Sequence, residues 1–362
     1  MSDLRRAPLY PPRTLLVMAG GTGGHIFPAI AVAEHLKEAG WHIAWLGNPD
    51  GMEARRVPQL GYQMVWVRFA ALRGKGLMRK LMLPVNLLRG FVQAAKAIRE
   101  VKPSAVLGMG GYITFPGGVM ARLLGRPLVV HEQNSIAGMA NRVLARLSRR
   151  SLCGFPNALP DSAWVGNPVR SDIAALPAPA ARFAGRSGPL RLLVVGGSLG
   201  AKVLNDTLPQ GLALIPPELR PEVIHQSGEQ HLAALAANYA AAGVKAECVA
   251  FIEDMAKAYA WADLVLCRAG ALTVAELAAA GVASILVPFP FAVDDHQTGN
   301  ARFLSQAGAA FLLPQPQLTP EAIALIRNYA RPQLLQMAEQ ARALARADAT
   351  ARVAQTCIEV AQ

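Results

Sequence analysis

The chain has 362 residues, more than one ordinary hydrophobic core holds, so its length predicts two domains with a cleft between them. Hydrophobic residues make up 52% of the sequence and charged residues 17%, which excludes a disordered chain, and no apolar run is long enough for a membrane-spanning helix. The net charge of +12 is uneven: residues 1–170 hold 22 Lys and Arg against 8 Asp and Glu, whereas residues 171–362 hold 14 against 16. A basic surface on one domain indicates an anionic partner there.

The N-terminal 13 residues contain charges and prolines but lack the apolar core of a secretion signal. The four cysteines, Cys153, Cys248, Cys267 and Cys357, show no metal-ligand spacing. These features predict a cytosolic chain with reduced thiols and no metal centre.

Two segments repeat one pattern. TLLVMAGGTGG at 14–24 and LRLLVVGGSLG at 190–200 each join an apolar run to a glycine turn that precedes a helical stretch. A buried strand, a glycine turn and a helix open a Rossmann-like βαβ unit, so the repeat predicts two such α/β domains in tandem, each with a parallel sheet. Further buried strands are expected at 43–46, 105–109, 128–131, 223–226, 246–251, 264–268 and 284–288.

Residues 171–189 are rich in Ala, Pro and Gly without a clear period, which is typical of a linker. We therefore expect the first domain at 1–170 and the second at 171–347. The Ala-rich sequence from 319 onward has charges at helical spacing, and a last helix at about 348–362 is expected to pack back on the first domain.

The segment GGTGGH at 20–25 places backbone amides at a predicted helix N-terminus, where the helix dipole favours an anion such as phosphate. The alternative is that these glycines only tighten the turn. Ile26 stands where the dinucleotide-binding motif GxGxxG has its third glycine, which weakens the case for a dinucleotide site. The segment GGSLGAKV at 196–203 lacks the Gly-Lys-Ser/Thr ending of a P-loop, so it does not support ATP hydrolysis of that type. His25 is the candidate general base, with helix capping or a hydrogen bond to phosphate as its alternative roles.

A third glycine loop, GMGGYITFPGG at 108–118, again follows a predicted strand. In CRAGALTVAELAAAG at 267–281, a predicted strand ends and a predicted helix begins. The start of this helix can hold a phosphate, and Glu276, one turn further, can accept hydrogen bonds from both hydroxyls of a ribose. The alternative for Glu276 is a glutamate stabilised only by the helix dipole. Many polar residues also lie between 288 and 301, after a predicted strand, which indicates contact with a ligand. Asp294, Asp295 and His296 have no further metal-ligating residue at a suitable spacing, so a metal site is not expected there.

Together these segments resemble glycosyltransferase family 28, the bacterial transferases that make the lipid II precursor of peptidoglycan. The resemblance spans nearly the whole chain and is carried, in the family's order, by GGTGGHIFPAIAVA, LGMGGYITFPGG, HEQNSIAGMANR, GNPVR, GGSLGAK, AYAWADLVLCRAGALTVAEL and DDHQTGNA. It implies a GT-B fold, in which two Rossmann-like domains with parallel sheets face each other across a cleft.

The family resemblance also implies the reaction. N-acetylglucosamine would move with inversion from UDP-N-acetylglucosamine to the muramyl 4-hydroxyl of undecaprenyl-pyrophosphoryl-N-acetylmuramyl-pentapeptide (lipid I), without a cofactor or a metal. By motif match, Ser198 and the helix start at 271–273 would contact the diphosphate, Ile252 the uracil, Glu276 the ribose and Gln297 the sugar. The implied donor-binding set is Thr22, Gly23, Gly24, Asn134, Arg170, Ser198, Ile252, Ala271, Leu272, Thr273, Val274, Ala275, Glu276 and Gln297. The implied acceptor-binding set is Gly20, Gly21, His25, Gly110, Gly111 and Tyr112.

A lipid acceptor gives the charge asymmetry a reason. Residues 68–102 contain nine Lys and Arg and one acidic residue between apolar side chains, a pattern typical of segments that lie on an anionic membrane. A solvated basic helix packed by its apolar face is the alternative. The family implies a peripheral location on the cytoplasmic face of the bacterial inner membrane, with other cell-wall synthesis proteins as further partners.

Three rival functions remain at this point. Another GT-B glycolipid transferase or a UDP-sugar epimerase would share the nucleotide-binding half but act on a different substrate. A non-catalytic basic membrane-surface protein would bind polyanions without transferring sugar, and no nucleic-acid-binding motif supports a nucleic-acid partner. An NAD-dependent dehydrogenase would show a nicotinamide-dependent change in absorbance.

Overall fold

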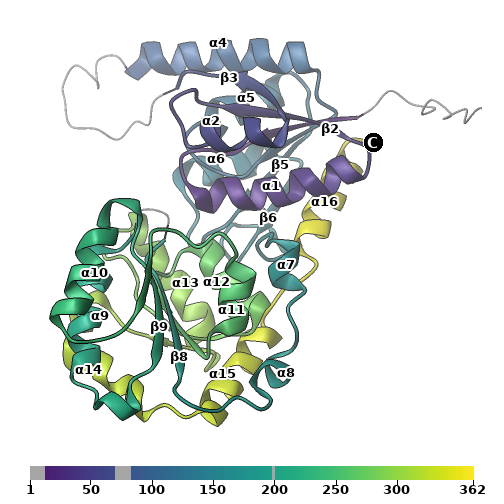
Figure 1. Cartoon of the computed structure of the whole chain (residues 1–362). Helices are drawn as coiled ribbons and strands as arrows, with labels where there is room; N and C mark the ends of the chain where they lie inside the picture. Colours follow the sequence, from purple (N-terminus) through teal and green to yellow (C-terminus); the bar gives the residue numbers. More distant parts are fainter. Residues whose placement is uncertain (1–12, 70–82, 198–199) are drawn as a thin grey trace, which may run out of the picture. The chain divides into compact units, whose positions relative to one another are not determined.

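The structure, a computed structural model, describes residues 13–69, 83–197 and 200–362. These form two compact units (Figure 1). The first unit is drawn from Met1–Gln133, Ala137–Pro168 and Asp348–Gln362, and the second from Asn134–Ile136 and Val169–Ala347. Each unit is described below by itself.

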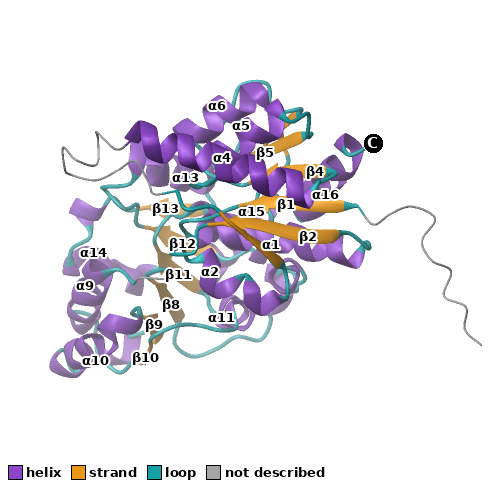
Figure 2. Cartoon of the chain, turned by 90° about the horizontal axis from the view of Figure 1, so that it is seen from above, coloured by secondary structure: helices purple, strands orange, loops and turns teal. Residues whose placement is uncertain are grey.

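The first unit is built on a parallel sheet with the strand order β3-β2-β1-β4-β5-β6-β7. Figure 2 shows β2, β1, β4 and β5 side by side in this order. Its strands are β1 (Thr14–Met18), β2 (His42–Gly47), β3 (Gln63–Trp66), β4 (Ala105–Gly108), β5 (Leu128–Glu132), β6 (Arg150–Cys153) and β7 (Ala163–Trp164). Its α-helices are α1 (Gly23–Glu38), α2 (Glu53–Arg56), α4 (Leu83–Val101), α5 (Thr114–Leu123), α6 (Met139–Leu147) and α16 (Ala349–Val360).

The second unit repeats this architecture with the strand order β10-β9-β8-β11-β12-β13, again parallel. Its strands are β8 (Arg191–Val195), β9 (Glu222–Gln226), β10 (Glu247–Val249), β11 (Leu264–Cys267), β12 (Ala283–Leu286) and β13 (Ala310–Leu312). Its α-helices are α7 (Ser171–Ala174), α8 (Pro179–Phe183), α9 (Lys202–Ala213), α10 (Leu232–Ala241), α11 (Met255–Trp261), α12 (Ala271–Ala280), α13 (His296–Ser305), α14 (Pro320–Ala324) and α15 (Arg331–Ala343). The prediction of two Rossmann-like α/β domains is confirmed.

The strands expected from apolar runs all form. Most of their side chains are buried, because helices cover both faces of a parallel sheet. β4, β5, β11 and β12 are buried along their whole length. The sequence did not indicate β3, β6, β7 or β13. These short strands lie at or next to sheet edges and are only partly buried, so their residues form no continuous apolar run.

The C-terminal helix α16 belongs to the first unit, where it packs along α1 (Figure 1). Its buried face contributes Val353, Ala354, Cys357 and Val360 to the same core as the apolar residues of β1 and α1. These residues recur at helical spacing, so one face of α16 is apolar. The chain thus leaves the first unit and returns to complete its core.

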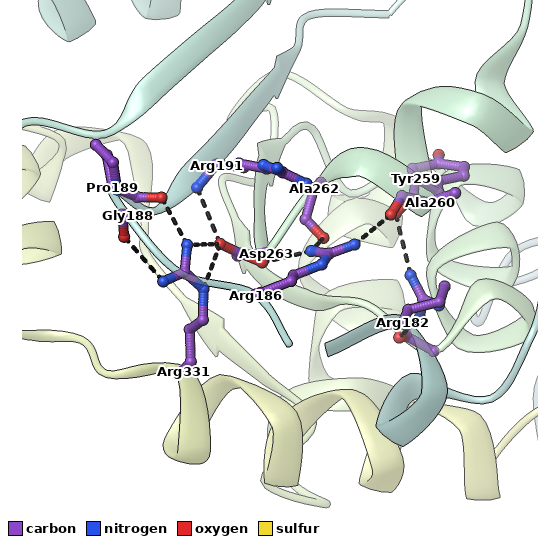
Figure 3. A network of polar contacts seen from close by, with 11 residues as sticks. Arg182, Arg186, Gly188, Pro189, Arg191, Tyr259, Ala260, Ala262, Asp263 and Arg331 are labelled. Atoms are coloured by element: carbon purple, nitrogen blue, oxygen red, sulfur yellow. Dashed lines mark hydrogen bonds and ion pairs between the residues drawn. The ribbon is translucent and has the colours of Figure 1, made fainter. Parts of the chain in front are cut away.

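Residues 171–189, expected to form a linker, fold into α7 and α8 and are anchored to the second unit by arginines (Figure 3). The Asp263 carboxylate has no exposed surface and forms ion pairs with Arg186 and, at 3.0 Å, with Arg331. Arg182 donates to the Tyr259 carbonyl at 3.1 Å, and burial lowers the pKa of its guanidinium to about 10. Composition gave no sign of this anchoring, because it depends on carbonyls and a carboxylate from distant parts of the chain.

Within the described part of the chain, no helix combines the length and the apolar character that crossing a bilayer requires.

Candidate functional site

The glycine segment of the first unit begins α1. Thr22 is the N-cap residue, and its carbonyl accepts from the amides of His25 and Ile26 at 3.1 and 3.2 Å. The amides of Gly23 and Gly24 precede this first turn of hydrogen bonds and have no intrahelical partner. The first turn contains no acidic residue. The loop therefore offers backbone donors and the positive end of a helix dipole to an anion.

A buried carboxylate that the sequence did not single out organises this loop. Glu53 accepts from the amide of Gly21 at 3.1 Å through Oε2 and from the amide of Asn48 at 3.0 Å through Oε1. A Cβ on Gly20 would lie 2.6 Å from Glu53 Oε1, and one on Gly51 would lie 2.4 Å from it. In the sequence, the one indication of this role is that several glycines lie near Glu53. Only the folded chain shows that these glycines surround the Glu53 side chain.

The second glycine loop of this unit lies directly against the first. A Cβ on Gly111 would come within 2.3 Å of the Gly20 carbonyl oxygen, and both Gly110 and Gly111 have positive φ angles of 100° and 86°. A Cβ on Gly110 would lie 2.7 Å from His25 Nδ1. Only glycine allows this approach without strain. The structure thus brings the predicted acceptor-side residues together: Gly20, Gly21, His25, Gly110, Gly111 and Tyr112.

His25 is the outer end of a chain of hydrogen bonds that runs into the first unit. Its Nδ1 lies 2.7 Å from Gln133 Oε1, and Gln133 Nε2 lies 3.0 Å from His131 Nδ1. His131 Nε2 in turn lies 2.9 Å from the Gly166 carbonyl oxygen. His131 is fully buried, and burial lowers its pKa to about 4. Gln133 and His131 were part of a recognised motif, HEQN, but were not predicted as site residues.

The second unit offers another helix start, that of α12. Gly270 is the N-cap residue and its carbonyl accepts from the Val274 amide at 2.9 Å, so the amides of Ala271, Leu272 and Thr273 have no intrahelical partner. The Val274 side chain is fully buried. No acidic residue occupies the first turn. This helix start therefore also suits an anionic group.

Glu276, one turn into α12, is a buried carboxyl with two partners. Arg170 Nη2 lies 3.6 Å from its Oε1, and the Tyr259 hydroxyl donates to Oε2 at 3.1 Å. Burial raises the pKa of Glu276 to about 7, which Arg170 and Tyr259 offset only in part. Burial also raises the pKa of Tyr259, which keeps this hydroxyl protonated as a donor. A carboxyl near its titration point, next to a helix start, is typical of a ligand-binding position.

Two amide side chains organise the loops beside α12. Asn300 is buried and donates to the Ala269 carbonyl at 3.1 Å and to Asn134 Oδ1 at 3.3 Å. Asn134 was expected in the first domain, whereas the structure groups residues 134–136 with the second unit. Gln297, at the start of α13, accepts from the Phe289 amide at 2.9 Å. No hydrogen bond joins the Gln297 amide nitrogen to another described residue.

The remaining predicted residues are placed as follows. Ser198 lies outside the described residues. Ile252 follows β10 with a half-buried side chain, and Ala275 is half-buried within α12. Thr22, Gly23 and Gly24 belong to the first unit, whereas Arg170, expected in the first domain, belongs to the second.

Two further features lie outside these loops. A groove of about 960 Å³ in the first unit is bordered by α6, β6, β7 and α16 and contains none of the predicted site residues. Among residues 13–69, 83–197 and 200–362, no three His, Cys, Asp or Glu side chains are grouped so that they can hold a metal ion.

Comparison with known proteins links both units to one family. Residues 15–152 match the glycosyltransferase family 28 N-terminal domain, and residues 191–356 match its C-terminal domain. A protein of Dechloromonas aromatica named UDP-N-acetylglucosamine--N-acetylmuramyl-(pentapeptide) pyrophosphoryl-undecaprenol N-acetylglucosamine transferase is 69% identical over 97% of this chain and 99% of its own length. A protein of the same name from Azoarcus is 68% identical over 97% and 99%. The crystal structure of Acinetobacter baumannii MurG superposes with a TM-score of 0.84 at 42% identity, covering 96% of this chain and all of that one.

Proposed function

The chain belongs to glycosyltransferase family 28 and has the GT-B fold, and on that premise we propose that it makes lipid II. The donor is UDP-N-acetylglucosamine, and the acceptor is the muramyl 4-hydroxyl of undecaprenyl-pyrophosphoryl-N-acetylmuramyl-pentapeptide. The observation that carries this proposal is the near full-length identity to transferases named for that reaction, 69% in one case. The resemblance drawn from the sequence motifs leads to the same family.

The two units supply different parts of the reaction. In the first unit, the loops that carry Gly20 and Gly110 bind the diphosphate of the lipid acceptor through backbone amides. In the second unit, Glu276 accepts the ribose hydroxyls of UDP, Gln297 contacts the sugar, and the start of α12 binds the donor diphosphate. The close approach of the Gly20 and Gly110 loops in the first unit supports this division, as do the contacts of Glu276 with Arg170 and Tyr259 in the second. The grouping of Asn134 and Arg170 with the second unit also agrees with their expected donor role.

The chemistry is a direct displacement that inverts the anomeric carbon. His25 takes the proton of the acceptor hydroxyl as its oxygen attacks the anomeric carbon, and the bond from that carbon to the UDP oxygen breaks. The negative charge that develops on UDP is stabilised by the preorganised amides at the start of α12, aligned with the helix dipole. In this scheme the helix provides the charge stabilisation that a bound metal ion provides in other transferases.

The proposal is tested by incubating the purified chain with UDP-N-acetylglucosamine and a lipid I analogue, and measuring UDP release together with the disaccharide product. We expect transfer that EDTA does not abolish. Changing His25 to Ala should lower kcat by about 10²- to 10⁴-fold, the usual contribution of a general base.

The matched control is His35→Ala, because His35 is an exposed histidine further along the same helix. It should leave transfer unchanged. Absence of any transfer by folded protein would contradict the proposed function. Full turnover by His25→Ala would remove His25 as the base and leave the proposed reaction standing.

We also propose that the first unit lies on the cytoplasmic leaflet of the membrane through α4. The outward face of this helix exposes Val85, Leu88 and Val92, at 56%, 66% and 62% of their surface, spaced so that they form one stripe. Arg89 and Arg99 are exposed on the same helix. Apolar side chains beside cations match the boundary between acyl chains and anionic headgroups. The basic residues at 70–82 lie outside the described part of the chain.

Co-sedimentation with vesicles tests this contact. The triple variant Val85→Ser, Leu88→Ser and Val92→Ser should bind vesicles of anionic lipid about tenfold or more weakly, since each buried apolar side chain contributes ~1.5–3 kcal/mol when fully covered. The control variant changes three comparably exposed leucines of the second unit to Ser, namely Leu214, Leu219 and Leu325. Equal binding by both variants would exclude α4 as the membrane contact.

A further inference from the structure

The hydrogen-bond chain behind His25 fixes the positions of its protons. Gln133 Nε2 lies 3.0 Å from two acceptors, His131 Nδ1 and the His131 backbone carbonyl. A carbonyl oxygen can only accept, so the amide nitrogen and not the amide oxygen must face it. The Gln133 side chain therefore has one orientation, with Oε1 directed at His25.

The inner end of the chain is determined in the same way. His131 Nε2 faces the Gly166 carbonyl at 2.9 Å, so Nε2 carries the proton of this ring. Its Nδ1 is then the unprotonated nitrogen and accepts from Gln133. A second proton on His131 would face the N–H of Gln133 and lose that hydrogen bond. The full burial of this ring also disfavours the charged form.

The outer end of the chain follows from these assignments. Gln133 Oε1 can only accept, so His25 Nδ1 must donate across the 2.7 Å that separates them. In the neutral ring, Nε2 then carries a lone pair. Within the described residues, no side chain or backbone group is hydrogen-bonded to His25 Nε2. Gly110 leaves the space for this arrangement, since a Cβ there would lie 2.7 Å from His25 Nδ1.

We propose that Gln133 and His131 are positioning residues that hold His25 in the Nδ1–H tautomer, so that Nε2 is the atom that takes the proton of the acceptor hydroxyl. The inference rests on the proposed transferase function and names the residues that prepare its base. Without this chain, a neutral histidine would divide between two tautomers and two ring orientations, and only part of the population would present an unprotonated Nε2.

The direct test is a long-range ¹H–¹⁵N correlation spectrum of the ligand-free protein with labelled histidines. His25 should show a protonated Nδ1 and an unprotonated Nε2, and His131 should show the opposite pattern. Spectra of His25→Ala and His35→Ala assign the signals. A His25 ring with protonated Nε2, or with averaged signals for both nitrogens, would overturn the proposal whether or not the chain transfers sugar.

Two variants of Gln133 test the consequence for turnover. Gln133→Leu removes the acceptor for His25 Nδ1–H and should lower kcat about tenfold or more, within the range of a lost general base, with little change in KM for either substrate. In Gln133→Glu, the second carboxyl oxygen takes the place of Nε2 and faces two acceptors, His131 Nδ1 and the His131 carbonyl, so the carboxyl carries a proton there and donates. Its other oxygen still accepts from His25 Nδ1–H. This variant should therefore recover most of the kcat that Gln133→Leu loses, a rescue that depends on the acceptor because the two substituted side chains are similar in size.

The outcomes separate the two proposals. Unchanged kcat in folded Gln133→Leu, beside an inactive His25→Ala, would overturn the positioning role and leave His25 as the base. If Gln133→Leu fails to fold, as judged by its unfolding transition, the tautomer spectrum of the unchanged protein and the turnover of Gln133→Glu still decide. A folded Gln133→Glu that loses as much kcat as Gln133→Leu would also count against the proposal.

Discussion

The two units share one architecture, but their candidate site residues follow different strands of the sheet. β1 and β8 occupy equivalent positions in the two sheets, and a glycine turn follows each. In the first unit the helix after β1 carries His25. In the second unit the buried carboxyl Glu276 is instead on α12, after the neighbouring strand β11. The shared fold therefore supplies several helix starts at one edge of each sheet, and individual side chains decide which of them becomes a site.

The buried histidines of the two units show the same contrast. Burial lowers the pKa of His131 to about 4 and that of His225 to about 3, so both rings are neutral. His131 uses both ring nitrogens, and its chain leads outward to His25. His225 Nδ1 lies 2.9 Å from the Tyr239 hydroxyl, and its Nε2 has no partner within the described residues. Burial keeps both histidines neutral. In the described part of the chain, only His131 of the two is linked by hydrogen bonds to a candidate site residue, so only His131 can affect that residue's tautomer.

The largest expected effect concerns the anchor of the second unit. Asp263→Ala should destabilise this unit by about 3–5 kcal/mol, because Arg186 and Arg331 would lose their buried counter-charge. Hydrogen exchange should increase in β8 and β11 and remain unchanged in β1 and β4. The control Asp206→Ala breaks an exposed pair with Lys202 and should change stability by less than about 1 kcal/mol. Equal loss of protection in both sheets would show that the units do not unfold separately.

A smaller effect is expected from the carboxylate that organises the first unit's loop. Glu53→Ala should cost about 1–3 kcal/mol, because the amides of Gly21 and Asn48 lose their acceptor. Faster amide exchange at these two residues, measured by NMR, checks the prediction. Glu100→Ala, an exposed glutamate on α4, is the control and should lie within about 0.5 kcal/mol of the unchanged protein. Unaltered exchange at Gly21 would mean that the loop holds its shape without Glu53.

The smallest effect is the pH dependence of donor binding. Glu276 has a pKa of about 7 in the folded protein against an ordinary value of 4.5. UDP affinity should therefore rise as pH increases through about 7, where the ionised carboxylate accepts the ribose hydroxyls, by about 1–2 kcal/mol or roughly 5- to 30-fold. Glu276→Gln should bind UDP more weakly and keep only the pH dependence of the UDP phosphate. An equally steep profile in this variant would exclude Glu276 as the titrating group.

Stability of the ligand-free second unit should change in the opposite direction. Because the folded pKa is the higher one, the protonated carboxyl stabilises the unit below about pH 4.5, and this contribution is lost as pH rises to about 7. Thermal unfolding across this range, compared with Glu276→Gln, separates this contribution from those of other groups.

The sequence by itself determined the fold class, most of the strands and the family. Continuous apolar runs such as those of β4 and β11 reveal buried parallel strands, because both faces of such a sheet are covered. Glycine turns after these strands mark helix starts, and the motifs around them are specific in combination. The sequence did not predict the short edge strands β3 and β13, because their partly exposed residues do not form a continuous apolar run.

Only the tertiary structure decided how the site residues are held. Gln133 meets His25 across 108 positions of sequence, and Glu53 meets Gly21 across 32, distances that no local pattern encodes. The assignment of residues 134–136 to the second unit likewise depends on the buried Asn300 side chain and the Ser135 amide, which are 2.8 Å apart. Sequence periodicity reports which face of an element is buried. Hydrogen bonds between distant loops depend on where the folded sheets place those loops, and that is why they had to be read from the structure.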